Sequence, residues 1–222
     1  TFPRVYVDAN REPYELDPLL FEEPLPAYAN SRSPRVAAGL GTIARVVASG
    51  REIYARPLTV AEALQRIERC YVPYHRALAA LIAETRARFG FCVLLDCHSM
   101  PTLREPFEQI AGAVRADVVL GDGHGSTAAP SLVRRAAETL IEAGLQIAHN
   151  VPYAGGFVTR HYGRPEGGVH ALQVEIARRL YMDERRMQPL PEFAALRRRL
   201  AALIRALGRW RPDEAALPRA AE

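Results

Sequence analysis

Three short, mainly apolar runs constrain the fold of this chain more than any other feature. They are Phe91–Leu95, Asp117–Leu120 and Leu145–Ala148, and polar residues follow each of them closely. The first is apolar throughout, which is typical of a strand covered on both faces, and the other two are predicted to be short strands. Patterns of helical period lie between and around the runs. Strands that alternate with helices predict an α/β domain with a largely parallel central sheet.

The helices are predicted from their start signals and apolar spacing. Thr59 and Glu62 form a capping box, and apolar residues at helical spacing then continue to about Arg88, where Gly90 ends the pattern. Two further helices are expected over 130–143 and 193–207. Near the start of the sequence, Arg4–Asp8 is predicted to form another strand.

Length and composition limit the class of protein. The 222 residues correspond to one domain, at about 100–200 residues per domain. Apolar types make up 49% of the chain, yet no apolar run approaches the roughly 18 residues of a membrane span. We therefore expect a soluble protein without membrane association. The sequence predicts a domain over 1–208 and a carboxyl-terminal tail over 209–222.

The charged residues and cysteines exclude several functions. All 29 basic residues are arginine, so lysine Schiff-base chemistry and the P-loop lysine are excluded. The net charge of +4 comes from arginines interleaved with acids, and no nucleic-acid recognition motif accompanies it, which predicts no nucleic-acid partner. Three cysteines fit neither a disulfide framework nor a metal clip, which favours the reducing cytoplasm.

The polar residues after the first apolar run are candidates for a metal site. Alternation along a strand places Asp96 and His98 on the same side. The carboxylate could therefore accept a hydrogen bond from the imidazole and orient it for metal binding. The alternative is a structural histidine held by hydrogen bonds. Cys97 faces the other way and cannot form a thiol dyad with His98.

Glu175 is the candidate general base, and its assignment depends on the secondary structure. In a strand, Gln173 and Glu175 share one face of an otherwise apolar run, which is costly unless that face lines a pocket. In a helix, Val169, Leu172 and Ile176 form the inner stripe and Glu175 faces water. The pattern leaves both structures open.

Two arginines are candidates for binding a substrate carboxylate. Asn10 and Arg11 follow the first predicted strand, and an arginine there could hold a carboxylate in bidentate fashion. Arg160 lies in a polar, glycine-rich segment that is predicted to be an active-site loop. For either arginine alone, a surface ion pair is the simpler interpretation. The segment Gly121–Ser126 does not have the spacing of a dinucleotide-binding loop.

Taken in order, several segments resemble the N-formylglutamate amidohydrolase family. They are Val7–Pro13, Leu94–Ser99, Leu120–Gly125, Asn150–Gly156, Thr159–Pro165, Gly168–Glu175 and Leu180–Glu184. The resemblance covers most of the chain. It implies a zinc carboxypeptidase-like α/β fold, with three α/β/α layers around a mixed central sheet.

The resemblance also implies an activity and residue roles. His98 matches a ligand of one Zn²⁺ ion, supported by Asp96, and Glu175 matches the general base. Asn10 and Arg11 match the pair that holds a substrate carboxylate, with Arg160 as a further substrate contact. The implied reaction is hydrolysis of a small acidic substrate, N-formyl-L-glutamate, to formate and L-glutamate, as in histidine catabolism. The rivals are a deacylase of another N-acyl amino acid and a metal-free protein that only binds carboxylates.

One part of the family pattern is not present in the sequence. Two further metal ligands are expected upstream of the Asn10–Arg11 pair, and Thr1–Ala9 offers only Asp8, which belongs to the later motif. We therefore expect an amino-terminal segment upstream of Thr1, the alternative being loss of the metal. The oligomeric state is not indicated by the sequence.

Overall fold

The computed structural model describes residues 1–47, 50–101 and 116–212. Contacts within the chain define two compact units, Thr1–Leu81 and Ile82–Glu222. None of the described helices combines the length and the apolar character needed to cross a lipid bilayer.

In the first unit, irregular chain over residues 1–47 and 50–59 and the start of a long helix pack around a small apolar core. Short helices η1 (Pro18–Leu20) and α1 (Pro34–Ala37) interrupt the loops. Leu16 and Ile43 are fully buried in the core cluster of this unit. A side chain at position 41 would overlap the carbonyl oxygen of Glu15, 2.2 Å from an added Cβ, so the close approach of these loops requires Gly41.

The predicted strand at Arg4–Asp8 is wrong. The amide of Tyr6 donates to the carbonyl of Pro3 over 2.9 Å, which bends the chain into a turn. The turn brings Arg4 over Asp8, where Nε of Arg4 lies 2.9 Å from Oδ2 of Asp8. Local hydrogen bonding and this ion pair therefore override the strand propensity of the segment.

The predicted helix from Thr59 is confirmed, with an irregular turn inside it. It comprises α2 (Val60–Arg66), the π-helical turn η2 (Ile67–Tyr71) and α3 (Val72–Phe89). Thr59 accepts from the amide of Glu62, and the Glu62 carboxylate accepts from the amide of Thr59, which completes the capping box. Gly90 follows the last residue of α3 in a left-handed conformation, with φ of 79°.

The second unit contains a mixed sheet with strand order β1-β4-β2-β3. Its strands are β1 (Cys92–Met100), β2 (Val118–Gly121), β3 (Ile147–His149) and β4 (Val169–Ala177). β1 pairs with β4 and β2 with β3 in parallel, whereas β2 and β4 are antiparallel. A two-residue pair, β5 (Met182–Asp183) and β6 (Gln188–Pro189), forms a separate small sheet.

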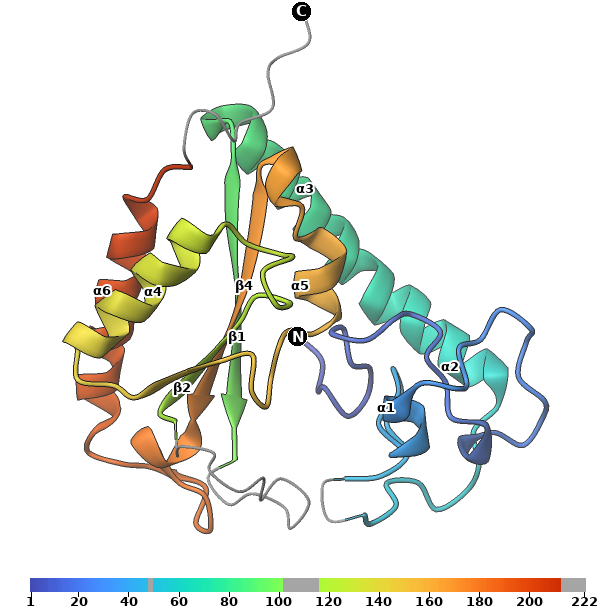
Figure 1. Cartoon of the computed structure of the whole chain (residues 1–222). Coiled ribbons are helices and arrows are strands. Elements are labelled where there is room, and N and C mark those ends of the chain that lie inside the picture. The colour runs from blue at the N-terminus through green and yellow to red at the C-terminus, as the bar shows by residue number, and fades with distance from the viewer. Residues whose placement is uncertain (48–49, 102–115, 213–222) are drawn as a thin grey trace, which may run out of the picture. The chain divides into compact units, whose positions relative to one another are not determined.

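Helices lie on both sides of the central sheet, as Figure 1 shows. α4 (Pro130–Glu142) and α6 (Phe193–Gly208) pack together on one side, over the face that carries Leu172 and Val174. The short helix α5 (Phe157–Tyr162) contacts β1 and β4 and lies on the other side. This arrangement confirms the predicted α/β/α layers around a mixed sheet.

The main core lies between the sheet and the pair α4 and α6. Leu132, Leu140 and Leu172 are fully buried there. Trp210, within the range predicted as the carboxyl-terminal tail, is also buried in this cluster, and residues 213–222 of that range lie outside the described residues. Because Leu172 and Val174 of β4 point into this core, the alternate residues Gln173 and Glu175 project from the opposite face.

Candidate active site

Asp96 and His98 form a hydrogen-bonded pair on β1. The prediction placed them at the exit of a strand, on the same side of it, and β1 contains both residues and continues to Met100. Nε2 of His98 lies 2.8 Å from Oδ1 of Asp96. Since an ionised carboxylate only accepts hydrogen bonds, the imidazole donates through Nε2, and Nδ1 then carries the lone pair that could bind a metal.

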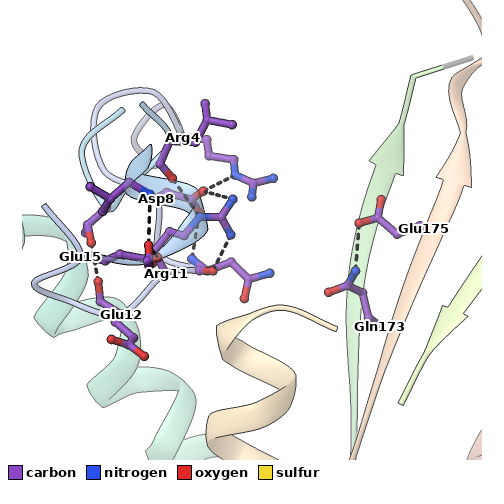
Figure 2. A network of polar contacts seen from close by, with 12 residues as sticks. Arg4, Asp8, Arg11, Glu12, Glu15, Gln173 and Glu175 are labelled. Atoms are coloured by element: carbon purple, nitrogen blue, oxygen red, sulfur yellow. Dashed lines mark hydrogen bonds and ion pairs between the residues drawn. The ribbon is translucent and has the colours of Figure 1, made fainter. Parts of the chain in front are cut away.

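Gln173 and Glu175 form a second pair, on β4. The strand conformation of Val169–Ala177 resolves the two structures that the sequence left open. Glu175 is 8% exposed and Gln173 is 4% exposed, so neither side chain simply faces water. Nε2 of Gln173 donates to Oε1 of Glu175 over 3.0 Å, and Figure 2 shows the two side chains on the same side of the strand.

The register of β1 and β4 brings the two pairs together. Asp96 lies opposite Gln173, and His98 lies opposite Glu175. Neighbouring strands are about 4.8 Å apart, and registered residues project from the same face. Four polar side chains therefore gather on the face opposite the apolar core. We call these residues, Asp96, His98, Gln173 and Glu175, the polar face.

The loop after β3 lies against the sheet beside the polar face. Gly121 is the register partner of Gln173 on β2. A Cβ at position 121 would lie 2.8 Å from both the carbonyl oxygen of Tyr153 and the carbonyl carbon of Ala154. The amide of Gly123 also donates to the carbonyl of Ala154 over 2.7 Å. Gly121 therefore permits the close approach of this loop.

Asp122, in the loop after β2, and Asn150, in the loop after β3, fix these two loops to each other. Nδ2 of Asn150 donates to Oδ1 of Asp122 over 2.8 Å, and the amide of Asp122 donates to Oδ1 of Asn150 over 3.0 Å. Asn150 adopts a left-handed conformation, with φ of 59°. This role was not predicted, although an aspartate between two glycines, Gly121 and Gly123, after a predicted strand was a usable signal.

Asn10 and Arg11 belong to a tight turn in the first unit. The amide of Asn10 donates to Oδ1 of Asp8 over 2.9 Å. Nε of Arg11 donates to the carbonyl of Leu40 over 3.1 Å, and Nη1 donates to the carbonyl of Asn10 over 3.0 Å. Nη2 of Arg11 lies 3.7 Å from Oδ2 of Asp8, and Figure 2 shows Arg4 and Arg11 around this carboxylate. Burial lowers the pKa of the Arg11 guanidinium, but an arginine remains charged.

Arg160 is exposed on α5. Its Nη1 donates to the carbonyl of Gly155 over 2.7 Å, so it is tied to the loop that lies against Gly121.

Cys97 does not have the character of a nucleophile, because partial desolvation and then the charge of Asp96 raise the pKa of its thiol.

A zinc ion needs more ligands than the polar face supplies. Among residues 1–47, 50–101 and 116–212, no three histidine, cysteine, aspartate or glutamate side chains gather to form a metal site. His98 does fit the role of one ligand, because its ring donates to a carboxylate, as metal-binding histidines usually do. The described residues are thus compatible with His98 as a single zinc ligand.

Comparison with known proteins assigns the chain to a family. The family model for N-formylglutamate amidohydrolase matches residues 1–182. The chain belongs to the N-formylglutamate amidohydrolase family. It is 34% identical over 162 residues to an N-formylglutamate deformylase of Pseudomonas aeruginosa, and 34% identical over 119 residues to one of Pseudomonas putida. These matches span 71% and 53% of this chain, and 59% and 43% of the two deformylases.

Solved structures support the fold of this family member. The chain resembles the N-formylglutamate amidohydrolase of Ralstonia eutropha JMP134 with a TM-score of 0.87 and 38% identity, over 94% of this chain and 75% of that one. A gene product of Agrobacterium tumefaciens matches with a TM-score of 0.59 and 23% identity, over 93% of this chain and 68% of that one. The second likeness supports the fold alone.

Proposed function

We propose that the protein hydrolyses N-formyl-L-glutamate to formate and L-glutamate. The observation that carries the proposal is the shared face and direct register of His98 and Glu175. The activity named for the Pseudomonas deformylases and for the Ralstonia amidohydrolase agrees with it.

Glu175 acts as the general base in this proposal. Its carboxylate takes a proton from the attacking water and returns it to the leaving amine nitrogen. The hydrogen bond from Gln173 holds one carboxylate oxygen in place. The carboxylate held by this bond is the group that accepts and returns the proton.

Asn10 and Arg11 bind the side-chain carboxylate of the substrate. The hydrogen bonds of Arg11 to Leu40 and Asn10 use Nε and one N–H of Nη1. An arginine carries five N–H donors, and we propose that the substrate carboxylate binds to those that remain on Nη1 and on Nη2, which also lies 3.7 Å from Oδ2 of Asp8. Arg160 is proposed as a further contact to the substrate.

We further propose that His98, supported by Asp96, is one ligand of a divalent zinc ion. When bound, zinc polarises the formyl oxygen and lowers the pKa of a bound water to about 7. The described residues supply this one ligand, so the proposal requires other ligands from elsewhere in the protein.

The experiment is an assay of the free α-amino group that hydrolysis releases from each substrate, measured with an amine-reactive dye on the full-length protein. N-formylglutamate, N-acetylglutamate and N-formylglutamine are compared at equal concentrations. We expect preference for the first, because the formyl group is small and Arg11 favours an acidic side chain. Preference for N-acetylglutamate would identify a different deacylase, and no hydrolysis of any of the three would reject the proposed function. Loss of activity with a chelator, restored by zinc, tests the metal separately.

A further inference from the structure

Two side chains of the long helix hold the backbone of the Asn10–Arg11 turn. The hydroxyl of Tyr71 donates to the carbonyl of Arg11 over 2.8 Å. Nε2 of His75 lies 2.9 Å from the carbonyl of Ala9. Because a carbonyl oxygen only accepts, His75 donates through Nε2. The two held carbonyls lie on either side of Asn10 in the sequence.

The two donors form one packed unit. The rings of Tyr71 and His75 have centroids 4.1 Å apart and an interplanar angle of 35°. Tyr71 is buried, with 5% of its surface exposed. A buried side chain in contact with its neighbour has few alternative rotamers. The hydrogen bonds to the turn are therefore made by preorganised groups.

The helix is irregular at the point where it meets the turn. Tyr71 is the last residue of the π-helical turn η2. Single π-helical turns within α-helices are frequent at functional sites. Just before this turn, the guanidinium of Arg66 lies 4.5 Å from the centroid of the Tyr6 ring and donates to the hydroxyl of Tyr54 over 2.7 Å. The helix thus contacts the 6–11 segment at three positions.

The backbone of this turn also fixes the arginine side chain. Nη1 of Arg11 donates to the carbonyl of Asn10, which lies between the carbonyls held by His75 and Tyr71. A rotation of either peptide would move the acceptor of Nη1 and shift the guanidinium. Bidentate binding of a carboxylate depends on such alignment, and a displacement of about 1 Å costs much of its benefit.

We propose that Tyr71 and His75 are positioning residues that set the selectivity of the protein for acidic substrates, by holding the turn that presents Arg11. The inference rests on the proposed function of Arg11 as the carboxylate-binding residue. Neither side chain touches the substrate in this proposal. Their loss therefore weakens binding of the substrate carboxylate without changing the chemical step.

The test compares N-formylglutamate with N-formylglutamine, which has a neutral side chain of the same shape. Tyr71→Phe removes the hydroxyl and keeps the ring. We expect KM for N-formylglutamate to rise about fivefold, the effect of one lost hydrogen bond, with kcat and the constants for N-formylglutamine within about twofold. His75→Phe should behave alike, and His75→Gln, which keeps an N–H donor, should restore most of the selectivity. Tyr28→Phe, which removes an exposed hydroxyl, is the matched control.

Wild-type protein and Arg11→Ala are measured first. If wild type does not hydrolyse N-formylglutamate, or if Arg11→Ala affects both substrates equally, the proposed function of Arg11 fails. If both behave as expected and Tyr71→Phe leaves KM unchanged, or raises it equally for both substrates, the positioning role alone is overturned. A fall in melting temperature without a change in selectivity would likewise assign Tyr71 a purely structural role.

Discussion

His98 on β1 and Glu175 on β4 are direct partners in the parallel register of the central sheet. Each is preceded, two residues earlier in its strand, by the side chain to which it is hydrogen-bonded, Asp96 for His98 and Gln173 for Glu175. Two residues that are 77 positions apart in the sequence (175 − 98) therefore project from the same face. The sheet itself, rather than a loop, holds the groups proposed for catalysis, which favours precise placement.

Glu175→Gln tests the general base. The amide preserves the size of the side chain but cannot take a proton, so we expect kcat for N-formylglutamate to fall by a factor of about 10²–10⁴. Zinc content, measured by elemental analysis, should stay at the wild-type level. Turnover within twofold of wild type would remove Glu175 from the mechanism.

Asp96→Asn tests the support of the His98 imidazole. The asparagine keeps the shape but loses the charge that favours a metal-binding ring, so we expect zinc affinity to fall about 10–100-fold. Competition with a chelator of known affinity gives the measurement without recourse to turnover. Cys97→Ser, on the opposite face of β1, is the matched control and should bind zinc as wild type does. Equal affinities for Asp96→Asn and the control would contradict the assignment.

The sequence predicted the second unit better than the first. The apolar runs and the capping box report local periodicity, and they located β1, β2, α4 and the long helix to within a few residues. Strand alternation predicted that Asp96 and His98 lie on the same side of β1, and the hydrogen bond between them confirms this placement. Glu175 could not be placed because Val169–Ala177 satisfies a strand pattern and a helix pattern equally.

The parts that were missed depend on contacts between distant positions. The turn at Tyr6–Arg11 is held by the carbonyl of Thr42, which accepts from the amide of Asp8 over 2.7 Å, and no local pattern reports that bond. The same applies to His75, which the sequence analysis left without a role and which contacts Ala9 through a backbone carbonyl. Acceptors on the backbone carry no residue identity, so sequence patterns cannot indicate them.

Gly121→Ala tests the approach of the loop to the sheet. The added methyl group would lie within 2.9 Å of the backbone at Tyr153, Ala154 and Gly155, so the loop must move. We expect a loss of about 1–3 kcal/mol in the free energy of unfolding, as for other overpacked sites, and faster proteolysis of the 150–156 loop. Gly208→Ala is the control, because nothing lies within 4 Å of an added Cβ there. Stability equal to that of the control would show that the loop adapts freely.

His170→Asn tests a pH dependence that originates in the core. Nδ1 of His170 accepts from the amide of Ala129 at the start of α4 over 3.2 Å, and its ring lies 5.0 Å from that of Trp210. Burial lowers the pKa of this imidazole below its ordinary value of 6.5. The unfolded chain therefore binds a proton that the folded protein does not, at any pH between the two pKa values.

The sign of the effect follows from this difference. Above pH 6.5 the imidazole is neutral in both states and costs nothing. As the pH falls through that value, protonation stabilises the unfolded chain, and the free energy of unfolding decreases until the folded imidazole also titrates. The substituted asparagine keeps an acceptor for the Ala129 amide but has no proton to gain.

Urea unfolding from pH 8 to pH 5, followed by the fluorescence of Trp210, should thus show a shallower decline in the free energy of unfolding for His170→Asn than for wild type. His149→Asn, at an exposed histidine, should follow wild type, and parallel curves for all three proteins would exclude His170 as the source.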